Sequence, residues 1–68
     1  MRNPNRIEPF MDELGKIWKE ECPDWRFGQL IFNVMDWMPG NGYLPFYMEE
    51  DKMLEAVKKY FKREDQDG

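Results

Sequence analysis

Apolar residues in the first third of the chain recur with the spacing of one helical face. They stand at i, i+4, i+7 and i+8: Phe10, Leu14, Ile17 and Trp18. Pro9 fits the first turn of a helix, and Pro23 ends it, because the residue before a proline is driven out of the α region. The pattern predicts a helix over Glu8–Glu21. Gly15 within it is unfavourable for helix formation, which suggests that a neighbouring helix passes close by.

The second segment is more apolar than the first and is expected to be the central helix. Its apolar stripe is continuous: Phe27, Leu30, Ile31, Val34, Trp37 and Met38. Asp24 is placed to cap its N-terminus, and the run Pro39-Gly40-Asn41-Gly42 ends it. These features predict a helix over Trp25–Met38.

The remainder of the chain combines an apolar connection with a third amphipathic segment. Tyr43–Met48 is too apolar for a free linker, so it is expected to fold back onto the core. Glu49, Glu50 and Asp51 suit the start of a helix, where negative charge complements the macrodipole. The face that follows is Met53, Leu54, Val57, Tyr60 and Phe61. The sequence predicts an all-α domain of three helices, the last over Glu50–Lys62, with residues 1–63 forming the single domain and 64–68 a disordered acidic tail.

The composition leaves little catalytic chemistry. Of 68 residues, 10 are Lys or Arg, 14 are Asp or Glu, one is Cys and none is His. The usual zinc ligand sets and a histidine-based triad therefore cannot be assembled. Cys22 has acidic neighbours that disfavour its thiolate, and Gly40-Asn41-Gly42 lacks the residues of a phosphate-binding loop. Three consecutive acidic residues, 49–51, cannot all face one ion on a helix. We predict no catalytic residue, no metal site and no cofactor.

The composition also limits where the protein is expected to reside and what it is expected to bind. No apolar run approaches the roughly 20 residues that span a bilayer, and a lone cysteine favours a reducing cytoplasm. A net charge of −4 argues against general nucleic-acid binding.

Polar residues on the second helix form one narrow stripe, Arg26, Gln29 and Asn33. Arg26 opposes the helix dipole in the first turn and therefore needs an acidic partner. That partner is either Glu20 or Glu21, or the corner formed by Glu49, Glu50 and Asp51. Gln29 and Asn33 either hold the Tyr43–Met48 segment or face outward. In the outward arrangement the stripe contacts a partner.

The aromatic content is the strongest functional signal. The chain has eleven Phe, Trp and Tyr residues and six Met, more than a core of this size accommodates, and these types are enriched at protein interfaces. We predict an exposed contact surface around Trp25, Phe32, Met35 and Tyr47. The alternative is that the aromatic residues only cover a thin core.

Two stretches, residues 23–33 and 45–51, resemble a family of short bacterial and phage proteins without an assigned activity. The shared pattern comprises Arg6-Ile7, Trp18, Asp24, Arg26, Gln29, Asn33 and Tyr47–Asp51. The resemblance implies a prokaryotic or phage cytoplasmic context. It also favours an ion pair of Arg26 with the corner Glu49, Glu50 and Asp51.

The function expected from these features is protein–protein interaction without enzymatic activity. The chain would form a homodimer or dock, as a modulator or inhibitor, on a larger host complex. The alternative is a nucleic-acid-associated regulator that uses the stripe Arg26, Gln29 and Asn33.

Overall fold

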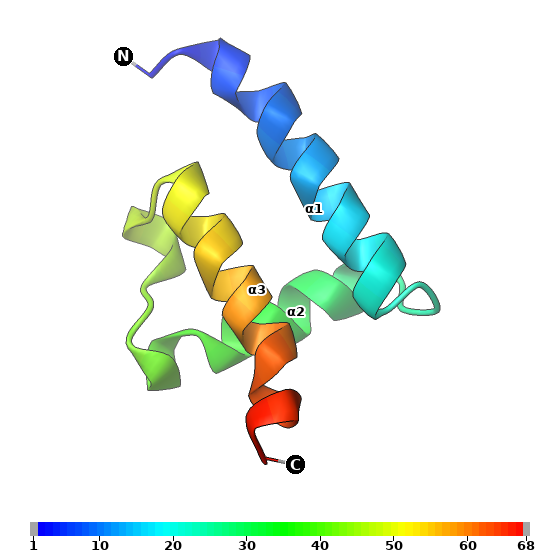
Figure 1. The fold of residues 1–68 in the computed structure, drawn as a ribbon. Coiled ribbons are helices and arrows are strands. Elements are labelled where there is room, and N and C mark those ends of the chain that lie inside the picture. The colour runs from blue at the N-terminus through cyan, green and yellow to red at the C-terminus, as the bar shows by residue number, and fades with distance from the viewer. Residues whose placement is uncertain (1, 68) are drawn as a thin grey trace.

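The computed structural model describes the backbone of residues 2–67 and the side chains of residues 2–62. Three α-helices and three short 3-10 turns follow one another in that range, and no strand occurs within it (Figure 1). The α-helices are α1 (Ile7–Glu21), α2 (Phe27–Trp37) and α3 (Glu50–Asp67). The turns are η1 (Pro4–Arg6), η2 (Pro39–Asn41) and η3 (Pro45–Tyr47). The predicted all-α three-helix class is confirmed.

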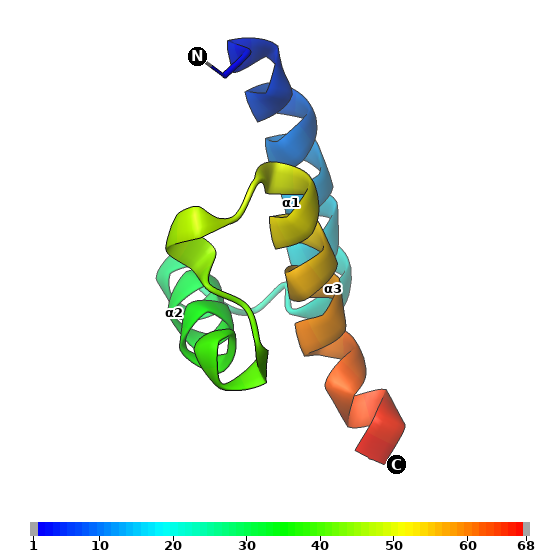
Figure 2. The same cartoon turned by 90° about the vertical axis from the view of Figure 1, so that its left-hand side faces the viewer.

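Helices α1 and α3 lie side by side and run in the same direction, whereas α2 crosses one side of the pair (Figures 1 and 2). Two ion pairs mark the parallel register. Arg6 contacts Glu50 at the start of both helices, and Glu13 contacts Lys58 two turns further along. Because α1 and α3 run in the same direction, the chain must return from the end of α1 to the start of α3, and α2 with the segment containing η2 and η3 provides that connection.

The core lies where the three helices face one another, and its largest fully buried side chains are Leu30 of α2 and Met38 directly after it. Leu30 is 1% exposed and Met38 is 0% exposed. Leu14 and Ile17 contribute from α1, and the buried residues of α3 are Ala56, Val57 and Tyr60. The second helix is therefore not the central one that the sequence predicted, because α1 and α3 pack directly against each other and α2 lies across one side of the pair, with Phe27 and Phe32 exposed (Figures 1 and 2).

Helix α2 begins two residues later than predicted, and Asp24 is not its cap. Residues 22–25 instead form a turn in which the Trp25 N–H donates to the carbonyl of Cys22 (3.0 Å). The Trp18 indole N–H donates to the Trp25 carbonyl (2.9 Å), which holds that peptide outside the helix. Arg26 takes the N-cap position, and its N–H is satisfied by the side-chain oxygen of Gln29 (2.7 Å).

The segment after α2 turns sharply at Gly42, whose φ of +88° suits glycine. The next residue, Tyr43, folds back as predicted. Its N–H donates to the Met38 carbonyl (3.0 Å), and its ring stacks on Trp37 with centroids 5.9 Å apart. Met48 at the other end of the segment also packs against the core. Leu44, Phe46 and Tyr47 between them are exposed, so the predicted return to the core is confirmed only at the two ends of the segment.

Helix α3 extends to Asp67, beyond the predicted end at Lys62. Gly68 lies outside the described residues. The expected close approach at Gly15 is also wrong, since a Cβ added there would meet no atom within 4 Å.

Candidate interaction surface

The most exposed large apolar side chains lie on α2 and on the η3 turn. Phe32 is 72% exposed, Tyr47 is 78% exposed and Phe46 is 91% exposed. The rings of Phe46 and Tyr47 pack against each other edge to face, with centroids 5.0 Å apart. Of the predicted contact residues, Phe32 and Tyr47 therefore lie at the surface.

The other two predicted contact residues are half-buried. The ring of Trp25 lies 6.1 Å from that of Phe61, and Met35 packs against the core with part of its side chain accessible. Phe46 was missed, although Pro45 before it was a signal. A proline at the first position of a short turn directs the chain away from a regular element, so the residues after it need not face the core.

An apolar groove of about 290 Å³ lies between α2 and the first turns of α1 and α3. Four of the six methionines line it, so we refer to it as the Met-rich groove. Its walls are Phe10, Met11, Leu14, Phe27, Leu30, Ile31, Val34, Met35, Met38, Glu50, Met53 and Val57. Glu50 is the one charged residue among them.

The groove continues onto the outer face of α2. A shallower depression there is lined by Phe27, Ile31 and Met35, which also line the groove, and by Phe32 and Asp36. The groove and the exposed ring of Phe32 therefore form one continuous apolar surface. Met35, half-buried as it is, connects the two parts.

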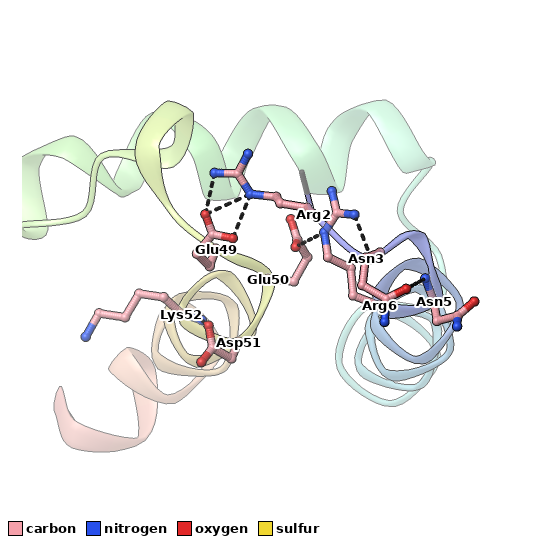
Figure 3. Close-up of polar contacts among 8 residues, drawn as sticks. All are labelled: Arg2, Asn3, Asn5, Arg6, Glu49, Glu50, Asp51 and Lys52. Atoms are coloured by element: carbon pink, nitrogen blue, oxygen red, sulfur yellow. Dashed lines mark hydrogen bonds and ion pairs between the residues drawn. The ribbon is translucent and has the colours of Figure 1, made fainter.

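Two arginines of the N-terminal segment reach across to the start of α3 (Figure 3). The Arg2 guanidinium donates to both carboxylate oxygens of Glu49, with the shortest contact at 2.6 Å. Arg6 donates to Glu50 at 2.5 Å. The third acidic residue of this corner, Asp51, accepts from the backbone N–H of Lys52 (2.8 Å).

These contacts correct the predicted ion pair of Arg26 with Glu49, Glu50 and Asp51. Arg26 precedes α2 at the end of the molecule where Trp25 meets Phe61. Phe61 stands eleven positions after Glu50, about 16 Å further along α3. The parallel alignment of α1 and α3 gives the corner to Arg2 and Arg6, and no ion pair of Arg26 occurs among the side chains of residues 2–62.

The polar stripe Arg26, Gln29 and Asn33 is exposed along α2 but is not assembled for phosphate contacts. Gln29 uses its amide oxygen to cap the Arg26 N–H. Neither Gln29 nor Asn33 holds the Tyr43–Met48 segment through a hydrogen bond within the described part of the chain. Asn33 opens onto a depression of about 610 Å³ that Glu21 and Asp24 also line, and these carboxylates would repel a nucleic-acid backbone.

The chemistry of Cys22 is that of a buried thiol. The side chain is 7% exposed and forms no disulfide. Burial, and secondarily the charge of Glu21, raises the pKa of Cys22, which disfavours the nucleophilic thiolate. Within residues 2–62, no group of three or more acidic or cysteine side chains is arranged to hold a metal ion. None of the described helices has the length and apolarity required to cross a bilayer.

A scan against protein-family models found no matching family, and searches of curated proteins and of solved structures found no match. The interpretation of this chain therefore depends on its own residues.

Proposed function

We propose that this protein is an interaction module without enzymatic activity, which binds another protein molecule through the apolar surface of the Met-rich groove and Phe32. The observation that carries the proposal is the 72% exposure of Phe32 at the edge of an apolar groove. Exposed contiguous apolar surface of this kind marks contact sites, because covering it with a partner removes it from water.

The surroundings of the surface support binding over catalysis. The groove lacks the convergent polar groups that orient a substrate, since Glu50 is already paired with Arg6. Cys22, the sole cysteine, is buried and its pKa is raised. A free thiol is compatible with a reducing compartment, so we place the protein in the cytoplasm. There it would self-associate or modulate a larger host or phage complex, in keeping with the resemblance noted in the sequence.

The test compares two neighbouring residues, of which only one belongs to the proposed binding surface. Phe32→Asp and Asn33→Asp introduce the same charge at adjacent exposed positions of α2, one on the apolar surface and one on the polar stripe. Each labelled variant and the wild-type chain are followed by sedimentation velocity in a lysate of the cells that produce the protein.

The wild-type chain should sediment faster than a free chain of 8.4 kDa. Phe32→Asp should return it to the free value, whereas Asn33→Asp should not. Release by Asn33→Asp alone would assign binding to the polar stripe, and a wild-type chain that sediments as a free monomer would contradict an interaction module.

A further inference from the structure

The form of the Met-rich groove indicates what kind of partner it binds. Along α2 its lining runs from Phe27 to Met38, about 16 Å at the rise of an α-helix. That length matches about three turns of a second helix, which would present apolar side chains at i, i+4, i+7 and i+11. The described chain offers no strand edge, so an extended peptide could not be bound by main-chain pairing.

The chemistry of the lining excludes a polar ligand and favours side chains of variable shape. Met11, Met35, Met38 and Met53 line the groove together. Methionine side chains are flexible and polarizable, and they adapt to the apolar residues of different helices. The apolar face of an amphipathic helix is the occupant with this property.

The charges at the rim of the Met-rich groove favour a partner helix with positively charged side chains. Asp36 lines the depression that adjoins the groove on α2, and Glu8 is exposed on α1 one turn before Met11. Among the side chains of residues 2–62, neither of these two carboxylates has an ion-pair partner.

The nearest basic groups do not offset these carboxylates. Arg2 and Arg6 are engaged by Glu49 and Glu50, and the lysines of α1, Lys16 and Lys19, lie in its second half. The whole chain carries a net charge of −4. A basic partner is attracted by this rim, whereas a second copy of the chain brings the same negative charge.

We infer that the Met-rich groove binds the apolar face of a basic amphipathic helix belonging to a partner protein. This inference rests on the proposed function and specifies its partner. Leucine-like side chains of the helix fill the groove, and its lysines or arginines face Asp36 and Glu8.

The test uses a model peptide of about 18 residues, long enough to be helical when bound, with Leu along one face and Lys elsewhere. A twin peptide carries Glu in place of every Lys. Binding to the intact chain is measured by fluorescence anisotropy at physiological salt. The Lys peptide should bind at least about tenfold more tightly than the Glu peptide.

Matched variants separate groove binding from general attraction between opposite charges. Met11 is 49% exposed, so Met11→Lys should fold, which thermal unfolding verifies. Asn33→Lys makes the same change in charge outside the groove. Met11→Lys should weaken the Lys peptide by about tenfold or more, and Asn33→Lys by no more than about twofold.

Methionine methyl resonances give an independent readout in the wild-type chain. The peptide should shift the signals of Met11, Met35, Met38 and Met53, with Met48, which does not line the groove, as the internal control.

Three results would overturn the inference. They are an absence of binding, equal binding of the Lys and Glu peptides, and equal weakening by Met11→Lys and Asn33→Lys. A dimer that dissociates on Met11→Lys would assign the groove to a second copy and would also reject the basic helix. If one of these results is obtained but Phe32→Asp still releases the chain from its complex in lysate, only the basic helix is rejected as the partner. If Phe32→Asp has no effect in lysate either, the proposed function is rejected as well.

Discussion

Substitutions at two residues of α2, Phe32 and Leu30, test whether the structure assigns surface and core positions correctly. Phe32 is 72% exposed and Leu30 is 1% exposed, although only one residue separates them. Full burial of a phenylalanine stabilises a fold by about 1.5–3 kcal/mol, so the buried part of Phe32 contributes about 0.4–0.8 kcal/mol. Alanine recovers up to about 0.7 kcal/mol through its higher helix propensity. Phe32→Ala should therefore change the free energy of unfolding by no more than about 0.5 kcal/mol.

Leu30→Ala creates a cavity in the core and should cost about 2–5 kcal/mol. In a chain of 68 residues each kcal/mol shifts Tm by about 4–8 °C. Thermal unfolding followed by circular dichroism should thus show a loss of about 8 °C or more for Leu30→Ala and a small change for Phe32→Ala. An equal loss for both variants would place Phe32 in the core and refute its assignment to a contact surface.

Three further predictions concern the rest of the fold. Gly15→Ala should stabilise the protein against urea by about 0.5–1 kcal/mol, because the added methyl meets open space and alanine favours the helix. The hydrogen bond from Arg2 lowers the pKa of Glu49 in the folded state. That contribution to stability is present above the glutamate pKa of the unfolded chain, about 4.3, and is lost as the pH falls through the lower folded value. Glu49→Gln should therefore reduce the acid sensitivity of Tm below about pH 5. Finally, the raised pKa of Cys22 predicts slow reaction with a disulfide reagent at about pH 8, and rapid reaction once urea unfolds the chain.

Each of these measurements has a control and a contradictory result. Gly42→Ala should destabilise, because its φ of +88° disfavours any side chain; a gain there, or a loss at Gly15, would show that the local backbone differs from the one described. High salt should weaken the exposed Arg2–Glu49 pair as the Gln variant does, and an unchanged acid profile in Glu49→Gln would remove the ion pair from the account. Fast labelling of Cys22 in the native protein would show that the thiol is accessible.

The three helices and their buried faces could be predicted because helical periodicity identifies the side of each segment that packs inward. Leu14, Leu30 and Val57 were all expected to face the core, and all three are buried. The start of α2 could not be predicted in the same way. It depends on the indole of Trp18 reaching the Trp25 carbonyl, a contact that exists only once the chain has folded.

The acidic corner shows a second limit of sequence reasoning. The charge pattern indicated that Glu49 and Glu50 would be paired, and they are, but the choice of Arg2 and Arg6 follows from the parallel alignment of α1 and α3. Nothing in local spacing distinguishes parallel from antiparallel neighbours across a connection of this length. Exposure was predicted for Phe32 and Tyr47, and both side chains are exposed. The Met-rich groove was not predicted, because its residues come from all three helices.

The central claim, that another protein molecule covers the apolar surface, is tested most directly by photo-crosslinking in the cells that produce the protein. A benzophenone amino acid placed at position 32 should give a discrete crosslinked product, which a dimer or a larger partner would supply. The same amino acid at position 59, on the exposed side of α3, should give none. Equal crosslinking at both positions, or none at position 32, would contradict the account.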